Sequence, residues 1–236
     1  MSSPTTDPTV QICRNCGGGA SVDVHFCPQC TKVLSLGRHG DYFAFLGVPR
    51  RLDLDLAALE QKFRALSRQF HPDFFYNATP AERRASLERS SYLNDAYRTL
   101  KQPIARIGYL LEIEGFTATT ANPSDVSKQV PPALLEEVFA LNEELDEVRE
   151  LRASGAPDDE WKARLHRARQ PIDDKREEHE LQLKELSAKW DALVESAGRA
   201  GHEAERRAVL GALSERMLER NYITNLLAGI ERELTT

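Results

Sequence analysis

Four cysteines near the start of the chain have the spacing of a metal site. Cys13 pairs with Cys16 and Cys27 pairs with Cys30, each as Cys-x-x-Cys. Four thiolates can close a tetrahedron around Zn2+, and such a closed site leaves no position for a reactive water. The spacing predicts a structural zinc ion in residues 1–39. Because so short a segment buries little core, the metal would supply most of its folding free energy.

The same four cysteines could adopt other states. Disulfides are disfavoured in a reducing compartment, and two Cys-x-x-Cys pairs are too regular for stray free thiols. Four cysteines can also hold an iron–sulfur cluster, or handle iron directly, and this alternative stays open.

The tripeptide His71-Pro72-Asp73 is the second group of side chains that could do chemistry. A residue before proline is pushed out of helical backbone angles, so a helix should end at Phe70. A new helix should start where Thr79 caps it, Pro80 takes its first position and Glu82 completes a capping box. The sequence therefore predicts an imidazole and a carboxylate on the turn between two antiparallel helices. Such a cluster suits contact with a partner better than burial in a core.

Amphipathic helices flank this turn. A short helix is expected within residues 41–49, and a longer one, capped by Asp53 or Asp55, should run to Phe70. The apolar positions of the longer helix recur at steps of three and four: Leu56, Leu59, Phe63, Leu66 and Phe70. Lys62, Arg64 and Arg68 lie beside or away from that stripe and form a cationic, solvated face. On the helix after the turn we expect Leu87, Leu93, Ala96, Tyr97 and Leu100 to face inward.

Composition limits the classes of function. The chain of 236 residues carries a formal net charge of -6, which argues against non-specific nucleic-acid binding. Basic residues outnumber acidic ones in residues 40–101, and acidic clusters dominate after residue 132, so two modules with different partners are expected. No apolar run approaches the roughly 20 residues of a membrane span. Residues 1–10 lack the basic start of a targeting signal, which predicts a cytoplasmic protein.

The segment from Asp41 to Leu100 resembles a J-domain, the module through which DnaJ-type cochaperones engage DnaK-type heat-shock chaperones. The resemblance rests on Asp41-Tyr42-Phe43, Leu46-Gly47-Val48-Pro49, the basic second helix, His71-Pro72-Asp73, and the run Ser91 to Leu100. It implies that His71, Pro72 and Asp73 contact the chaperone's ATPase domain and interdomain linker. Lys62, Arg64 and Arg68 would attract an acidic chaperone surface. An ordinary solvated face is the alternative for these charges, and we favour partner contact because acids do not offset them.

Helical patterns return after a linker rich in Thr, Ser, Asn and Pro. In residues 132–152 an apolar seam of alternating four and three steps is expected to pack on neighbouring helices: Leu134, Val138, Leu141, Leu145 and Val148. A long helical stretch follows, in which Pro171 either kinks the helix or starts a fresh one. A last helix begins after the break at residues 198–201. Three main antiparallel helices predict a bundle.

The first bundle helix carries a second apolar face. Leu135 and Phe139 lie about 100° and 140° from the seam and should face water, with Glu143 and Glu147 continuing that face. An exposed apolar pair rimmed by acids is a candidate protein-binding patch. The alternative is that the linker or the J-domain-like module buries the pair.

The run from Lys101 to Leu111 narrows the resemblance to HscB, the J-protein of iron–sulfur cluster assembly. In HscB proteins the first bundle helix binds the scaffold protein IscU, so the resemblance implies scaffold contacts for Leu135, Phe139, Glu143 and Glu147. Tyr222 on the last helix is the best match to an aromatic of that surface, and a core position is its alternative. Two features depart from the family: most bacterial HscB proteins lack the cysteine segment, and this bundle is longer between Asp158 and Glu178.

No nucleophile motif or phosphate loop is visible, so the sequence predicts a non-enzymatic cochaperone of all-α fold. The expected organisation is a small zinc-ribbon-like segment (1–39), a J-domain with connecting helix (40–114), a linker (115–131) and a helical bundle (132–236). The bundle would hold an IscU-type scaffold while the His-Pro-Asp turn stimulates the ATPase of an HscA/DnaK-type chaperone. The alternatives are a general J-protein serving other clients and a zinc-ribbon regulator that touches nucleic acid.

Overall fold

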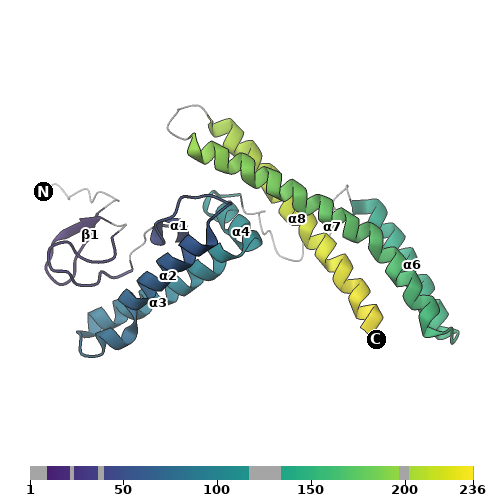
Figure 1. Cartoon of the computed structure of the whole chain (residues 1–236), viewed down its shortest axis with the longest axis horizontal. Helices are drawn as coiled ribbons and strands as arrows, with labels where there is room; N and C mark the ends of the chain where they lie inside the picture. Colours follow the sequence, from purple (N-terminus) through teal and green to yellow (C-terminus); the bar gives the residue numbers. More distant parts are fainter. Residues whose placement is uncertain (1–9, 22–23, 37–39, 117–133, 197–201, 236) are drawn as a thin grey trace, which may run out of the picture. The chain divides into compact units, whose positions relative to one another are not determined.

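The computed structural model describes residues 10–21, 24–36, 40–116, 134–196 and 202–235. The chain divides into two compact units, Met1–Ile113 and Glu114–Thr236 (Figure 1). The expected all-α class is confirmed, since the described residues of both units are mainly helical, with one two-stranded sheet among them. Almost all of the expected linker 115–131 lies outside the described residues. None of the described helices is long and apolar enough to cross a membrane.

The first unit begins with a small β-hairpin. Strands β1 (Val10–Ile12) and β2 (Gly19–Ser21) pair antiparallel, with Gln11 opposite Ala20. A single bridge between Phe26 and Val33 closes a second loop. This segment's own buried cluster contains little besides cysteines, so it depends on its neighbours and on any metal for stability.

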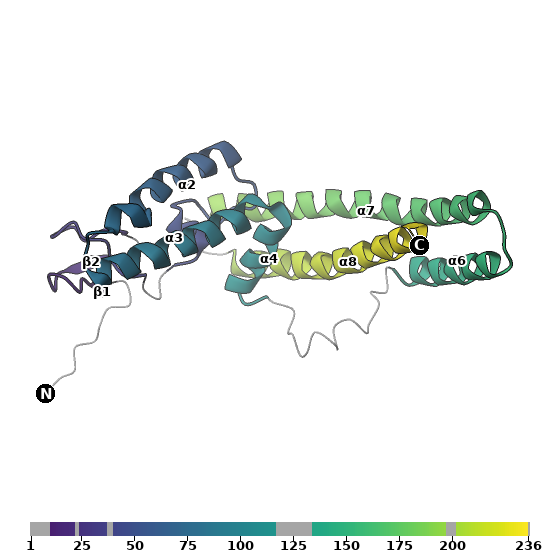
Figure 2. The same ribbon diagram turned by 90° about the horizontal axis from the view of Figure 1, so that it is seen from below.

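Four α-helices and one 3-10 turn complete the first unit. They are α1 (Tyr42–Phe45), α2 (Leu56–Phe70), η1 (Pro72–Phe75), α3 (Pro80–Lys101) and α4 (Pro103–Ile113). Asp41 caps α1, and Asp55, one of the two predicted candidates, caps α2 by accepting from two backbone N–H groups. The predicted capping box of Thr79 and Glu82 opens α3. Helices α2 and α3 pack as an antiparallel hairpin with the turn η1 between them (Figure 2).

Two leucines expected on inner faces are exposed instead. Leu56 lies in the first turn of α2, where the hairpin does not cover it. Leu87 is exposed because the buried face of α3 runs through Ser86, Arg89 and Leu93, each three or four residues apart. The inner positions near the His-Pro-Asp end of α3 are therefore a serine and an arginine, which hydropathy alone assigns to the surface.

In the part of the second unit that the structure describes, the helices are α6 (Leu135–Ala153), α7 (Asp158–Glu195) and α8 (Glu203–Thr235). Both α6 and α8 pack along α7 (Figure 2). The predicted seam is present, with Leu134, Leu141 and Val148 buried against α7 and α8. Since α6 has 19 residues and α7 has 38, only half of α7 can have α6 beside it. Pro171 lies inside α7 and starts no new helix.

A buried histidine links α7 to α8. His179 Nε2 lies 2.7 Å from the Arg216 carbonyl oxygen, to which a neutral ring donates its proton. Burial lowers the pKa of His179 below its ordinary value of 6.5, although the bond to Arg216 partly opposes this. The folded bundle therefore binds fewer protons than the unfolded chain when the pH falls below about 6.5.

The bundle should lose stability on acidification through that pH range. Stability is full above the unfolded pKa of His179 and falls as the pH drops toward the folded one. Both tryptophans, Trp161 and Trp190, are buried in the second unit, so urea unfolding followed by tryptophan fluorescence reports on this unit. The midpoint should be lower at pH 5.5 than at pH 7.5. A His179→Gln variant should flatten this dependence, and an unchanged slope would remove His179 as its source.

Candidate functional site

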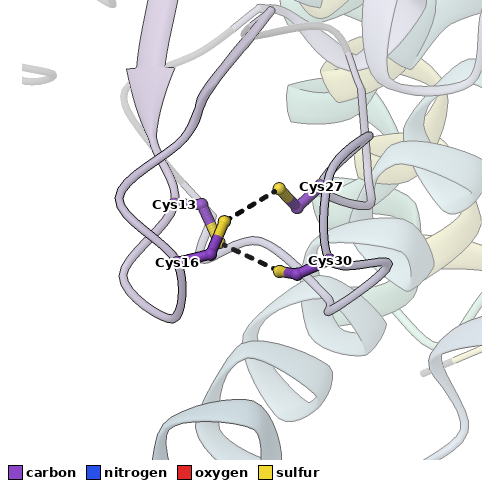
Figure 3. A group of neighbouring side chains, drawn as sticks. All are labelled: Cys13, Cys16, Cys27 and Cys30. Atoms are coloured by element: carbon purple, nitrogen blue, oxygen red, sulfur yellow. Dashed lines mark hydrogen bonds between the residues drawn. The ribbon is translucent and has the colours of Figure 1, made fainter.

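The four cysteines converge on one point (Figure 3). Their sulfur atoms all lie within 4.8 Å of one another, with Cys13 to Cys30 and Cys16 to Cys27 each at 3.7 Å. A zinc–sulfur bond of about 2.3 Å in a tetrahedron separates neighbouring sulfurs by roughly 3.8 Å. All four are free thiols, so the disulfide alternative is not realised. The arrangement fits a single tetrahedral ion.

Two equivalent backbone turns present the thiols. The Cys13 carbonyl accepts from Gly17 N–H and its N–H donates to Gly18, while Cys27 bonds to Thr31 and Lys32 in the same way, all at 2.9 Å. Each turn needs a left-handed residue at the same position, which is Gly17 in the first (φ 73°) and Thr31 in the second (φ 59°). The turns aim both thiols of each pair toward the shared centre.

The donor set can hold zinc or another thiolate-binding ion. A multi-iron cluster places irons and sulfides between its thiolates and spreads them more widely than these sulfurs lie. Hydrogen bonds from the Lys32 backbone N–H, and next from Asn15, lower the pKa of the Cys30 thiol to about 6. The pKa of Cys16, which hydrogen-bonds within the same group of thiols, is raised instead, so the four thiols release their protons as a group.

The cysteine segment docks on α3, a placement that the sequence did not indicate. Arg89 is buried and donates to two carbonyls of the segment, Leu34 at 2.7 Å and Ser35 at 3.3 Å. Lys32 pairs with Glu82 at 2.9 Å. Burial, and next the Arg89 guanidinium, lower the pKa of His25 to about 4, so its neutral ring lies beside the arginine at neutral pH.

The His-Pro-Asp turn lies at the exposed end of the hairpin. The His71 and Asp73 side chains are 52% and 86% exposed. The Asp73 backbone N–H donates to His71 Nδ1 at 3.3 Å, which leaves the outer nitrogen, Nε2, available to a partner. Pro72 opens the 3-10 turn, and Phe74 N–H donates to the His71 carbonyl at 3.0 Å. The turn therefore presents an imidazole and a carboxylate from an ordered backbone.

The predicted basic face of α2 is exposed, but its charges are not equivalent. Lys62 donates to the Gly47 carbonyl and so helps to close α1. Arg64 forms an ion pair with Glu60 at 2.6 Å, so the expectation that acids do not offset these charges is wrong for Arg64. Arg68, which is closest to the turn, makes no ion pair with any described residue. It is the best placed of the three for a partner.

Two exposed aromatics beside the turn escaped the sequence reasoning. Phe74 and Tyr76 are 74% and 77% exposed, and the Phe74 ring lies 6.0 Å from the His71 ring. Neither falls on a helical stripe, which is why periodicity did not indicate them. Their signal in the sequence was two large aromatics in a turn, where polar residues are usual.

The predicted patch on α6 faces outward. Leu135 and Phe139 are 39% and 65% exposed, and Glu143 is exposed beside them. Glu147 forms an ion pair with Arg164 of α7, which Glu144 also contacts at 3.0 Å. The apolar pair and Glu143 thus lie free on α6, while Glu147 joins the patch to α7.

Tyr222 is less exposed than Leu135 and Phe139. It is partly buried and packs against the core that α6, α7 and α8 share. This agrees with the alternative of a core residue. Its place on a scaffold-binding surface stays a prediction.

Two solved structures resemble this chain over most of its length. No family model matches it. The crystal structure of human co-chaperone protein HscB is similar at a TM-score of 0.64 and 25% identity, covering 94% of this chain and 98% of that one. Chaperone HscB from Vibrio cholerae is similar at a TM-score of 0.52 and 26% identity, covering 81% and 96%. The chain is thus similar over most of its length to two HscB co-chaperone structures, and it combines a J-domain-like hairpin and a helical second unit with four cysteines placed as a metal site would need.

Proposed function

We propose that this protein is a cochaperone of iron–sulfur cluster assembly. The exposed His-Pro-Asp turn on an HscB-like fold carries the proposal. In it, the turn contacts the ATPase domain of an HscA/DnaK-type chaperone while the second unit holds an IscU-type scaffold. The protein itself catalyses nothing, binds no nucleic acid and works in the cytoplasm.

The chaperone contact would use the turn as its specific element and the basic face for attraction. His71, Pro72 and Asp73 must bind the hydrolysis-competent state of the chaperone more tightly than the other state, because equal affinity shifts no equilibrium. Exposed charges such as Arg68 raise the encounter rate more than the final affinity. Arg64 is paired with Glu60 and Lys62 donates to the Gly47 carbonyl, so these two residues would contribute less to the attraction of a chaperone.

The scaffold contact would use Leu135 and Phe139 as apolar anchors within an acidic rim. A large exposed aromatic ring such as Phe139 is the kind of side chain that dominates interface energetics. Glu143 and Glu147 would select a partner surface with basic residues. Tyr222 would add to this surface from α8.

Removing both anchors should weaken scaffold binding without unfolding the bundle. For Leu135→Ala with Phe139→Ala, the dissociation constant for IscU should rise about tenfold or more, equivalent to roughly 1.4 kcal/mol. Isothermal calorimetry with purified IscU measures it. Leu181→Ala is the matched control, since Leu181 is 58% exposed, between Leu135 and Phe139, but lies on α7. Unchanged binding by the double variant would exclude the patch. Binding of unfolded clients but not IscU would instead favour a general J-protein.

A zinc ion held by Cys13, Cys16, Cys27 and Cys30 completes the proposal. The closed donor set supports a structural ion with no reactive position. Metal analysis of the purified protein identifies the bound ion. Iron in place of zinc would support the alternative in which the cysteines handle iron directly.

A further inference from the structure

Phe70 is the residue that connects the His-Pro-Asp turn to the body of the first unit. It is the last residue of α2, directly precedes His71 and is completely buried. Its carbonyl accepts from Ser86 at 2.7 Å and from Ser90 at 2.8 Å, both on α3. The position of Phe70 therefore fixes where the chain enters the turn.

Much of the surroundings of the Phe70 ring comes from the tetracysteine segment. Phe26 stacks on it with ring centres 5.8 Å apart, and His25 meets it edge-on at 5.0 Å. Phe45 of α1 contributes a further contact at 6.1 Å. Without the segment, one side of the ring would face water. A buried aromatic that loses such contacts forfeits on the order of 1 kcal/mol or more.

Arg89 fastens the segment to the same place. Its guanidinium donates to the Leu34 and Ser35 carbonyls, lies 2.7 Å from His25 Nδ1, and passes over the Phe70 ring at 5.7 Å. Burying an arginine is costly unless its donors are satisfied. Here the segment supplies those acceptors. If the segment unfolded, Arg89 would have to leave its buried position beside Phe70.

The segment cannot hold this shape through its own core. Its buried cluster consists of Cys13, Ala20, Cys27 and Leu34, with Cys30 packed against them. Three of these five residues are the metal-binding cysteines, so the ion replaces a hydrophobic core. Metal occupancy is therefore coupled to Arg89 and to Phe70.

We propose that the metal-loaded tetracysteine segment positions the His-Pro-Asp turn, with Phe26 and Arg89 as positioning residues acting through Phe70. Metal occupancy would thus set how much of the protein presents a competent turn. Contacts within the first unit position the turn. The consequence of this positioning for a chaperone rests on the proposed function.

Hydrogen exchange tests the positioning of the turn without a partner. The Phe74 amide, which donates to the His71 carbonyl, reports on the turn, and the Arg106 amide, which donates to the Gln102 carbonyl, reports on the start of α4. In Cys27→Ser with Cys30→Ser, and in metal-loaded Phe26→Ala, Phe74 should exchange about tenfold faster while Arg106 changes little. Ile12→Ala, an exposed position in the same segment, should leave both amides unchanged. Equal Phe74 exchange in all variants would overturn the inference.

A second arm measures stimulation of the DnaK-type chaperone. A turn that is competent only part of the time lowers apparent affinity by that fraction. Phe26→Ala and Arg89→Lys should therefore raise the concentration of this protein that gives half-maximal ATPase stimulation by about three- to tenfold. This increase is counted after correction for the fraction of each variant that is folded. The maximal stimulated ATPase rate should stay the same. Phe26→Leu, which keeps an apolar side chain on Phe70, should restore the wild-type half-maximal concentration. Wild-type half-saturation in Phe26→Ala would overturn the consequence for the chaperone. If instead His71→Gln stimulates fully, the proposed function fails, and hydrogen exchange still decides the positioning.

Discussion

Replacing His71 by Gln is expected to abolish stimulation of a DnaK-type ATPase while leaving the protein folded. The stimulated rate should fall to about a tenth or less, a loss of at least roughly 1.4 kcal/mol of stabilisation for the hydrolytic state. The fold should survive because the His71 and Asp73 side chains are exposed, and exposed polar contacts contribute little to stability. Single-turnover ATP hydrolysis by the chaperone measures the effect.

The matched control lies in the same turn. Asn77 is exposed and outside the tripeptide, so Asn77→Ala should stimulate like the wild type. Asp73→Asn should resemble His71→Gln, since both side chains face a partner from one ordered backbone. IscU binding should be equal in all three variants because the α6 patch lies in the other unit. Full stimulation by His71→Gln would exclude the proposed J-domain function.

Replacing Cys27 and Cys30 by Ser is expected to remove the metal and unfold the tetracysteine segment. Apparent metal-binding free energies of about 10–16 kcal/mol for small structural zinc sites are folding free energies, so little structure should remain without the ion. The metal content measured by elemental analysis should fall from one ion per chain to none. The thermal transition of the first unit, followed by near-ultraviolet tyrosine signals, should drop because Arg89 loses its acceptors at Leu34 and Ser35.

Two internal controls accompany this variant. The tryptophan transition of the second unit should not move, because Trp161 and Trp190 are buried in that unit and the cysteines belong to the other. Thr31→Gly should keep the metal, since Thr31 adopts the left-handed backbone that glycine favours. A serine variant that retained one ion per chain would show that the four cysteines are not its ligands.

The tertiary structure explains why the metal segment and the turn belong together. In the sequence they are separated by about forty residues and appear as two independent motifs. In the folded chain Phe26, Arg89 and Phe70 form one packed group between them. A cochaperone whose turn depends on a metal ion would lose chaperone affinity when metal is scarce. The ion would then influence function even though its closed site has no reactive position.

Local rules were enough to determine several features from the sequence. The Thr79 and Glu82 capping box, the end of α2 at Phe70 and the cap at Asp55 depend on residues within one turn of one another. The Cys-x-x-Cys spacing determined how each pair of thiols is presented for the same reason, because each pair is held by its own short loop. The exposed pair on α6 followed from helical periodicity.

Only the tertiary structure decided which side chains meet across elements. The sequence pattern placed Leu87 inside, yet Leu87 is exposed. Arg89, which no pattern marked, is buried because it finds carbonyl acceptors on a segment more than fifty residues away. Arg64 finds Glu60, and Lys62 closes α1, so a basic face counted from sequence overstates its free charge. The four cysteines and the His-Pro-Asp turn could be recognised from sequence because their geometry is local. Their physical connection through Phe70 could not, because burial and pairing depend on contacts that only the folded chain makes.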